Sequence, residues 1–145
     1  MRPNVNIRLA TKIDVDFFYQ SICELQNKTF DYEKFKTIFF DNLSSINNLY
    51  LILEQEKEEI GIITLHKQNL LHHCGQVAEI QEFYIQSKYR GQGLGKYILK
   101  VITKYCKLNN ILSLEVSTNK KRIENVEIYK KLGFNLSHNK FTLEL

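Results

Sequence analysis

The sequence predicts one α+β domain, in which about four helices pack on the faces of a mixed, mostly antiparallel sheet of six or seven strands. Two observations support this class. Short segments alternate apolar and polar residues, whereas others repeat apolar residues at helical spacing. The chain has 145 residues, the size of one domain, and contains no repeat, low-complexity segment or linker. We therefore expect residues 1–145 to form a single domain.

The first half of the chain predicts a strand, two helices and a hairpin. Residues 5–10 alternate as a strand does, and residues 13–26 repeat apolar side chains at helical spacing. Asp31 suits the N-cap of a second helix, whose aromatic side chains we expect to fill the core. Residues 49–53 and 60–66 are rich in β-formers and joined by a polar stretch, which indicates an antiparallel hairpin.

The second half alternates strands with helices. A loop over 67–76 leads to a strand at 77–85, and a glycine-rich turn then opens an amphipathic helix. Residues 111–116 predict a buried strand, and residues 123–132 a helix that ends at Gly133. Residues 134–145 predict one or two closing strands.

Composition excludes several classes of protein. Hydrophobic residues make up 43% and charged residues 25%, and no apolar run approaches the roughly 20 residues of a membrane helix. The first residues lack the apolar core of a signal peptide, which predicts a cytoplasmic location. The net charge of +4 is too small for a nucleic-acid surface but suits small anionic ligands such as phosphates. Cys23, Cys74 and Cys106 are widely spaced, which predicts free thiols.

The glycine-rich turn is the most informative segment. It comprises Arg90, Gly91, Gln92, Gly93, Leu94, Gly95 and Lys96. Between a strand and a helix, such a turn directs backbone N–H groups at the positive end of the helix dipole, where a phosphate or pyrophosphate binds. The glycines permit close approach and positive φ, and Lys96 adds a cation. The spacing differs from that of nucleotide hydrolases and dinucleotide folds, and a purely structural turn is the alternative.

In this context the turn resembles the cofactor signature of the GNAT superfamily of N-acetyltransferases, [Gln/Arg]-x-x-Gly-x-[Gly/Ala]. Arg90, Gly93 and Gly95 occupy its fixed positions. The segment IYKKLGF, residues 128–134, resembles the (F/Y)Y-x-x-x-GF ending of the same superfamily. The resemblance implies the GNAT fold, acetyl-CoA held by its pyrophosphate in the turn, and direct attack of a primary amine on the thioester.

The resemblance also implies roles for residues around the thioester. The main chain of the preceding strand, at Phe83, Tyr84 and Ile85, binds the pantetheine arm. Asn119 and the helix around Tyr129 flank the thioester, with Tyr129 as the acid that protonates the departing thiolate. An aromatic side chain that only packs in the core is the alternative for Tyr129.

Two glutamates, Glu79 and Glu82, are candidates for the base that accepts the ammonium proton. They are three residues apart, so in a regular strand they would face opposite sides and only one would reach the amine. The superfamily places a base in an Ala-Glu-Ile context, which favours Glu79. A solvated or ion-paired carboxylate, with water as the relay, is the alternative.

A closer resemblance extends over nearly the whole chain, to the aminoalkylphosphonate N-acetyltransferases of bacterial phosphonate metabolism. It is carried by segments such as ICEL (22–25), LHH (71–73), EIQE (79–82) and STN (117–119). This resemblance implies a small aminophosphonate as the acceptor and a response to divalent metals.

Histidines and basic residues complete the predicted acceptor site. His72 and His73 are expected to line it, and with His66 and a glutamate they are candidate ligands of a divalent metal, although neighbouring histidines point opposite ways in extended chain. Lys121 and Arg122 lie where a helix begins, a position that disfavours cations unless an anion is near. A phosphonate or a phosphate of CoA is such an anion, and a solvated basic cluster is the alternative.

The predicted function is therefore acetyl-CoA-dependent N-acetylation of a small primary amine, with an aminoalkylphosphonate as the favoured acceptor. A polyamine, an aminosugar or a protein amine is an alternative acceptor. A non-catalytic module that binds acyl-CoA is an alternative of another class. Neither a nucleic acid nor a membrane is an expected partner, and the sequence leaves open whether two copies form a homodimer.

Overall fold

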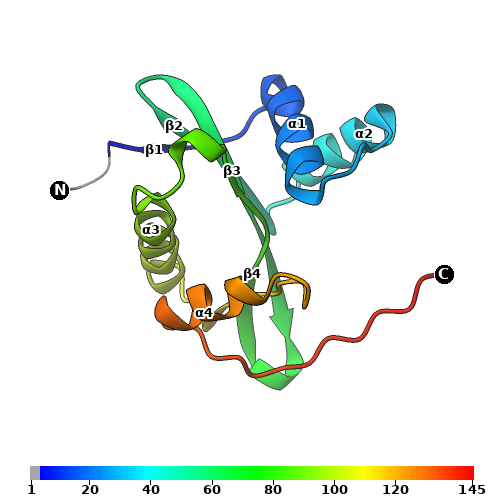
Figure 1. Cartoon of the computed structure of the whole chain (residues 1–145). Coiled ribbons are helices and arrows are strands. Elements are labelled where there is room, and N and C mark those ends of the chain that lie inside the picture. Colours follow the sequence, from blue (N-terminus) through cyan, green and yellow to red (C-terminus); the bar gives the residue numbers. More distant parts are fainter. Residues whose placement is uncertain (1–3) are drawn as a thin grey trace.

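The computed structural model describes residues 4–145, in which a five-stranded sheet has helices on both faces (Figure 1). The strands are β1 (Asn6–Leu9), β2 (Asn48–Gln55), β3 (Glu58–Leu70), β4 (Gly75–Ile85) and β5 (Ser113–Val116). The helices are α1 (Val15–Gln26), α2 (Tyr32–Leu43), α3 (Leu94–Leu108) and α4 (Ile123–Lys131), with short 3-10 turns at Lys12–Asp14, Leu71–His73 and Ser87–Tyr89. None of the helices in this part of the chain is both long and apolar enough to cross a membrane.

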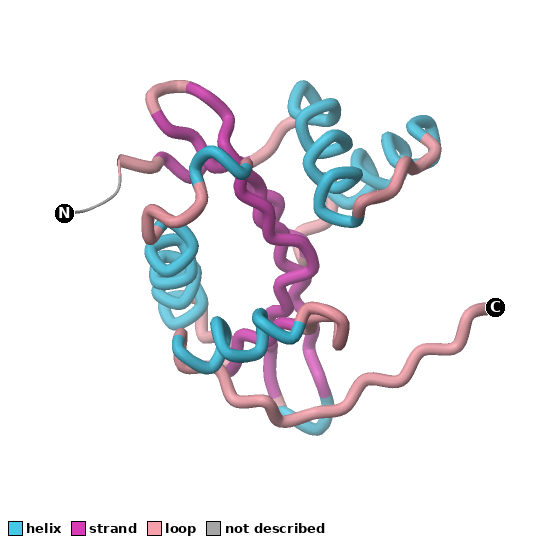
Figure 2. The backbone as a smooth tube through the Cα atoms, in the orientation of Figure 1, coloured by secondary structure: helices cyan, strands magenta, loops and turns pink. Residues whose placement is uncertain are grey.

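The sheet follows the order of the chain, β1-β2-β3-β4-β5, so that neighbours in sequence are neighbours in space. Figure 2 shows the strands running between α1 and α2 on one side and α3 and α4 on the other. Pairing is antiparallel from β1 to β4 and parallel between β4 and β5. The connection from β4 to β5 contains α3, because parallel neighbours need a crossover. The α+β class and the four helices that the sequence predicts are confirmed.

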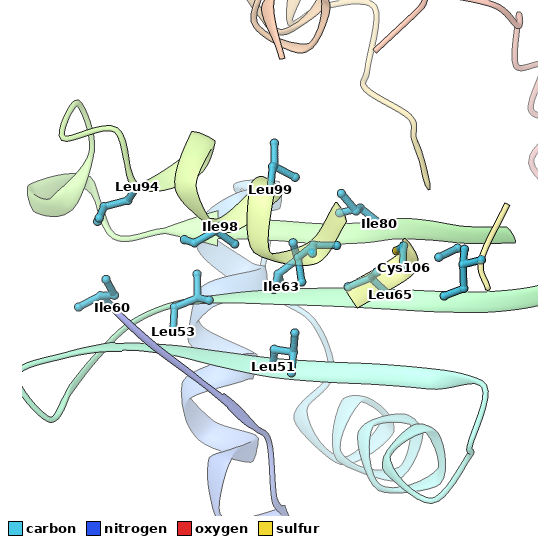
Figure 3. Close-up of a cluster of buried hydrophobic side chains, with 13 residues drawn as sticks. Leu51, Leu53, Ile60, Ile63, Leu65, Ile80, Leu94, Ile98, Leu99 and Cys106 are labelled. Carbon is cyan, nitrogen blue, oxygen red and sulfur yellow. The ribbon is translucent and has the colours of Figure 1, made fainter. Parts of the chain in front are cut away.

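Two apolar layers hold the helices on the sheet. One layer joins α3 to the side chains that β2, β3 and β4 direct to that face, including Leu53, Ile63 and Ile80 (Figure 3). The other joins α1 and α2 to the opposite face, where Phe18, Phe39, Ile52, Ile62 and Tyr84 meet. Ile62 and Ile63 are consecutive and lie in different layers, as the alternation of a strand requires.

The prediction of six or seven strands is wrong, because residues 134–145 form no strand. Phe141 and Leu143 alternate with polar residues as a strand does, yet their exposed fractions are 92% and 85%. The pattern is present, but no strand within residues 4–145 is paired with it. A strand forms in a sheet only when its backbone can hydrogen-bond to a neighbouring strand, and an alternating apolar pattern alone is not enough.

The hairpin of β3 and β4 is longer than the sequence predicts. The loop expected over 67–76 is mostly strand, because the ladder continues through Lys67↔Ala78 to Leu70↔Gly75. Only the turn at Leu71–His73 and Cys74, which has a φ of 50°, remains outside it. Ile13 also differs from expectation: it precedes α1 in a 3-10 turn and is exposed.

Candidate active site

The site forms where β5 stops following β4. The two strands pair only from Val77↔Ser113 to Ile80↔Val116, whereas β4 continues to Ile85. Within the described chain, the β5-facing edge of β4 therefore has no strand partner between residues 81 and 85. Main-chain groups that alternate along this edge can bind an extended ligand, which is the role that the family resemblance implies for Phe83, Tyr84 and Ile85; the carbonyl of Ile85 already accepts from Arg90.

A cavity of about 550 Å³ opens at this divergence, and we call it the β4–β5 cavity. It extends between the end of β4, the loop after β5, the first turns of α4 and the end of α1. The lining includes Phe83, Tyr84, Ile85, Arg90, Ser117, Asn119, Arg122 and Tyr129. Six of these eight are residues that the sequence assigns to the cofactor, and Arg122 is assigned to the acceptor.

The glycine-rich turn lies at one end of this cavity. Arg90 lines the cavity, its Nε donates to the carbonyl of Ile85 at 2.7 Å, and its guanidinium lies over the ring of Tyr84. Gly91 and Gly93 have φ of 75° and 77°, so both positions need the left-handed region as the sequence predicts. Gly95 does not, because it already belongs to α3.

Helix α3 begins at Leu94 with free amides. Gly93 is its N-cap and supplies no side chain, and the first intrahelical bond runs from the amide of Tyr97 to the carbonyl of Gly93. The amides of Leu94, Gly95 and Lys96 therefore have no partner within the helix. The side chain of Leu94 is buried in the α3 layer, whereas Lys96 and Gln92 are exposed. Free amides and the helix dipole together can hold a pyrophosphate.

Tyr129 lines the β4–β5 cavity from α4. Its ring packs edge-on against Phe134, with the ring centres 5.6 Å apart. Burial raises the pKa of its hydroxyl, and the positive charge of Arg122 lowers it to a smaller extent. The hydroxyl therefore keeps its proton at neutral pH, as a general acid must.

Three other predicted residues surround the start of α4. Arg122 lines the cavity, and its Nη2 donates to the carbonyl of Leu25 at 2.9 Å, which ties α4 to the end of α1. Asn119 also lines the cavity, but its Oδ1 accepts from the amide of Lys121 at 2.9 Å and so shapes the turn. Lys121 is exposed and lines neither of the two cavities described here.

A second cavity, of about 360 Å³, lies between α1, α2 and the sheet, and we call it the α1–α2 cavity. Aromatic side chains that the sequence assigns to the core form much of its wall, among them Phe30, Phe35 and Phe39. Polar groups of the strands also face it: Tyr50, Thr64, His66 and Glu82. Sequence reasoning missed this cavity, although polar residues alternating along the strands opposite aromatic helices were a usable signal.

The two cavities meet at Gln26 and Gln81, which line both. Gln81 is a β-bulge, because Thr64 pairs with Glu82 while Leu65 pairs with Ile80. A bulge leaves one residue unpaired and bends the strand. Here the bulge lies at the boundary between the two cavities.

The bulge also corrects the expected geometry of the glutamates. Glu79 is opposite His66, and Glu82 is opposite Thr64. His66 and Thr64 are two apart on β3, so both glutamates face the α1–α2 side, not opposite sides as in a regular strand. Only Glu82 lines a cavity. Thr64 holds it twice: the Thr64 hydroxyl donates to the Glu82 carboxylate, and the Glu82 amide donates to the Thr64 Oγ1 at 3.0 Å.

The histidines are distributed differently from the prediction. His72 and His73 are in the turn at the tip of the β3–β4 hairpin, and neither lines either cavity. His66 does line the α1–α2 cavity: its ring stacks on Tyr50, and its Nε2 is buried without a hydrogen-bond partner. Among residues 4–145, no three His, Cys, Asp or Glu side chains are grouped in a way that fits a metal ion.

Comparisons with known proteins match the chain to one family. The model of the acetyltransferase (GNAT) family matches residues 16–134. The chain is 35% identical over 143 residues to the aminoalkylphosphonate N-acetyltransferase of Salmonella typhimurium, which covers 99% of this chain and 93% of that protein.

Solved structures show the same fold at low sequence identity. A transcriptional regulator from Bacillus halodurans C-125 has a TM-score of 0.87 at 21% identity, covering 97% of this chain and 99% of that one. The glucosamine-6-phosphate N-acetyltransferase of Arabidopsis thaliana has a TM-score of 0.77 at 19% identity, covering 97% of both chains.

Proposed function

The chain belongs to the GNAT family and is an acetyl-CoA-dependent N-acetyltransferase, and we propose that its acceptor is a small primary amine bearing a phosphonate. One observation supports the arrangement of the reaction most directly. The β4–β5 cavity and the α1–α2 cavity meet at the Gln81 bulge, so a thioester in the first and an amine in the second would come together there. The aminoalkylphosphonate N-acetyltransferase of Salmonella typhimurium supports the choice of amine.

Acetyl-CoA supplies the activated acetyl group, and the residues of the β4–β5 cavity fit it. We assign the pyrophosphate to the free amides at the start of α3, where Gly91 and Gly93 leave open space. The unpaired edge of β4 before Ile85 offers main-chain groups to the pantetheine arm. Asn119 and Tyr129 line the cavity beyond that edge.

Two side chains then handle the protons of an amine acyl transfer. Glu82, held by Thr64 in the α1–α2 cavity, accepts the proton that the ammonium loses before the nitrogen attacks the acetyl carbon. Tyr129 donates its proton to the sulfur as the carbon–sulfur bond breaks, and the second proton that the nitrogen loses on becoming an amide returns the Tyr129 hydroxyl to its protonated form. Glu79 is the other candidate base, but it faces the sheet surface outside both cavities.

Arg122 is our candidate for binding the phosphonate of an amine held in the α1–α2 cavity. It lines the β4–β5 cavity, and its bond to Leu25 places it next to Gln26, where the two cavities meet. Of the residues that line the two cavities, only Arg90 and Arg122 are Lys or Arg, and Arg90 is bound to Ile85 at the turn. Arg122 uses one nitrogen for Leu25, and a guanidinium carries five N–H donors, so donors remain for an anion. Each charge-assisted bond to a phosphonate oxygen contributes roughly 1.5 to 3 kcal/mol.

The test is a comparison of three amines of similar size. We expect kcat/KM to be highest for aminoethylphosphonate, lower for β-alanine and lowest for propylamine. Arg122→Ala should lower kcat/KM for the phosphonate by about 10- to 100-fold, the loss of one charge-assisted bond. Propylamine reports any general damage from losing the Leu25 contact, and Lys121→Ala is the matched control. A parent enzyme that prefers propylamine, or treats all three alike, would refute the phosphonate assignment and leave the acetyltransferase intact.

The lining of the α1–α2 cavity supports a second candidate acceptor, a polyamine. Aromatic rings and the Glu82 carboxylate surround this cavity, and no Lys or Arg lines it, which suits a cationic or apolar body. Adding spermidine to the same panel decides between the two. A kcat/KM for spermidine well above that for aminoethylphosphonate would favour the polyamine.

A further inference from the structure

The exposed side of α3 carries a row of lysines. The helix contains no Asp or Glu, and its charged residues, all exposed, are Lys96, Lys100, Lys104 and Lys107. Their spacing of three or four residues places them on one side of the helix, opposite the side that packs on the sheet. We call them the α3 lysine row. It extends about 16 Å, because each residue adds about 1.5 Å to a helix.

The α3 lysine row accounts for the net charge of the chain. The sequence has 20 Lys and Arg, and the 16 outside the row are equal in number to the 16 Asp and Glu, so the net charge of +4 is that of the row. Within residues 4–145, none of its lysines forms an ion pair. Like charges four residues apart destabilise a helix, and Lys96 is in the first turn, where the dipole disfavours a cation. An anionic partner would relieve both effects.

The cofactor alone does not cover this row. Lys96 lies beside the turn to which we assign the pyrophosphate of CoA, whereas Lys104 and Lys107 lie about 12 and 16 Å farther along the helix. The Debye length is about 8 Å at physiological ionic strength, so a phosphate at the turn is screened from the far half of the row. The partner must therefore carry several negative charges in a line.

We propose, on the basis of the function proposed above, that the α3 lysine row docks an acidic carrier protein that bears its acetyl group on phosphopantetheine. The enzyme would then accept acetyl from this carrier as well as from CoA. Both donors present a pantetheine arm and a thioester to the β4–β5 cavity. In the carrier, a phosphate joins the arm to the protein. With that phosphate on the free amides at the start of α3, the protein lies beside the turn, where the row begins.

Charge complementarity favours an acidic helix as the surface that meets the row. A helix has the same rise per residue as α3, so carboxylates spaced three or four residues apart match the lysines along the whole row. A nucleic acid also supplies negative charges in a line. It carries no thioester, however, and so gives no reason for the row to begin at the turn that holds the donor.

The transfer from the carrier follows the same steps as the transfer from CoA. The amine nitrogen bonds to the acetyl carbon, and the carbon–sulfur bond of the carrier thioester breaks. Glu82 accepts the ammonium proton, Tyr129 protonates the departing sulfur, and the second proton lost by the nitrogen restores Tyr129. The products are the N-acetylated amine and a carrier with a free thiol.

The test compares three acetyl donors with the full chain and whichever amine of the panel above reacts fastest with acetyl-CoA. The donors are acetyl-CoA, acetyl-phosphopantetheine and an acyl carrier protein loaded with acetyl-phosphopantetheine. We expect kcat/KM for the loaded carrier to exceed that for free acetyl-phosphopantetheine by at least about tenfold in about 20 mM salt. The advantage should vanish in about 500 mM salt, where surface charges are screened.

Charge reversal in the far half of the row tests the docking surface. Lys104→Glu with Lys107→Glu should remove the advantage of the carrier and change kcat/KM for acetyl-CoA by less than about twofold, because both residues are distant from the turn. Lys34→Glu with Lys131→Glu makes the same change of charge at exposed lysines of α2 and α4, and this matched control should keep the advantage. The neutral pair Lys104→Gln, Lys107→Gln should lose part of it, which tests the row even if the reversed pair is unstable.

The outcomes separate this proposal from the proposed function. Turnover of acetyl-CoA without turnover of the loaded carrier overturns the carrier and leaves the acetyltransferase intact, whereas failure with all three donors contradicts both. A carrier advantage that survives both Lys104 and Lys107 pairs overturns the docking surface, and so does an equal loss in the control pair. Binding of a short RNA duplex that depends on the row, without turnover of the carrier, would assign the row to a nucleic acid and overturn the proposal.

Discussion

Tyr129 combines the position and the ionisation state of a general acid. It lines the β4–β5 cavity, and burial raises the pKa of its hydroxyl above the usual 10.0. Tyr129→Phe should lower kcat by about 10- to 1000-fold and leave acetyl-CoA affinity nearly unchanged, because the ring contact with Phe134 survives. Thiol release measures the rate, and calorimetry measures binding. Because the pKa is raised above 10.0, the loss of activity through ionisation of Tyr129 should reach its midpoint only above pH 10.0. A variant with the kcat of the parent would remove Tyr129 from the mechanism.

Glu82 and Glu79 form a matched pair for testing the base. Both are on the same strand and face the same side of the sheet, but only Glu82 lines the α1–α2 cavity. Glu82→Gln should lower kcat/KM by about 100-fold, since the carboxamide keeps a bond to Thr64 but cannot accept the proton. Glu79→Gln should change kcat/KM by less than about threefold. The reverse result would assign the base to Glu79, and no effect of either would indicate a water relay.

The residues of the candidate site could largely be predicted from the sequence, whereas their arrangement in space could not. The residues of the turn follow from its glycine spacing, and Asn119 and Tyr129 follow from the family resemblance; all of them lie on one cavity or beside it. The relation of Glu79 to Glu82 depends on the bulge at Gln81, which reverses the expected alternation and leaves no mark in the apolar pattern. His66 lines the α1–α2 cavity because the aromatic residues of two helices leave a gap over β3. Such a gap depends on tertiary packing and cannot be read from the sequence pattern.

Helix α3 offers a test of the proposed pyrophosphate site with an internal control at its other end. Gly93 precedes the helix with a φ of 77°, and Asn110 follows it with a φ of 57°. A valine at either place is strained by roughly 1 to 2 kcal/mol. We expect Gly93→Val and Asn110→Val to lower the free energy of unfolding by similar amounts. Only Gly93→Val should weaken acetyl-CoA binding, by at least about tenfold, as calorimetry would show.

The comparison is decisive because the two variants share the same kind of strain on the same helix. A folded Gly93→Val protein with the acetyl-CoA affinity of the parent would exclude the turn as the pyrophosphate site. Equal loss of affinity in both variants would mean that binding follows the general stability of α3, not contact with the turn.

Whole elements were predicted well where the apolar pattern and the partner both lie within the chain. The two N-terminal helices, the β2–β3 hairpin and the strand before the turn fall close to their expected residues because burial in the two layers selects their periods. Residues 134–145 show the converse: a strand pattern alone does not create a strand when no neighbour is available among residues 4–145. The longer β3–β4 hairpin arises from pairing of polar residues such as Gln68 with Val77, which no hydrophobic pattern encodes.

The stability of the whole molecule depends on an ionic cluster that joins its first strand to the rest. Arg8 on β1 donates two hydrogen bonds to Asp14, at 2.8 and 2.9 Å, and also pairs with Glu54 on β2 and Glu59 on β3. Asp14 is only 4% exposed and further accepts from the amide of Thr11 at 2.7 Å. The bonds from Arg8 lower the pKa of Asp14 below its usual 3.8, against the opposing effect of burial.

Because the pKa of Asp14 is lowered in the folded state, its contribution to folding stability decreases as the pH falls. The Asp14 contribution is fully present above pH 3.8 and is lost as pH falls through the lower folded pKa. Glu59 acts in the opposite sense: burial and then Asp14 raise its pKa, so it contributes stability at low pH that is lost as pH rises through the folded value. We expect Asp14→Asn to lower the free energy of unfolding by roughly 1 to 3 kcal/mol at about pH 7, because it leaves part of the Arg8 charge unpaired.

The difference between parent and variant should shrink as the pH falls below about 4, since a protonated carboxyl and a carboxamide at this position are then nearly equivalent partners of Arg8. Urea unfolding at about pH 7, 5 and 3 measures this difference in the free energy of unfolding. Asp41→Asn on the exposed side of α2 removes the same charge from a residue outside the Arg8 cluster, and should change stability by less than about 0.5 kcal/mol. A deficit of Asp14→Asn that stays constant across this pH range would show that Asp14 acts through packing, and its ion pair with Arg8 would then contribute nothing to stability.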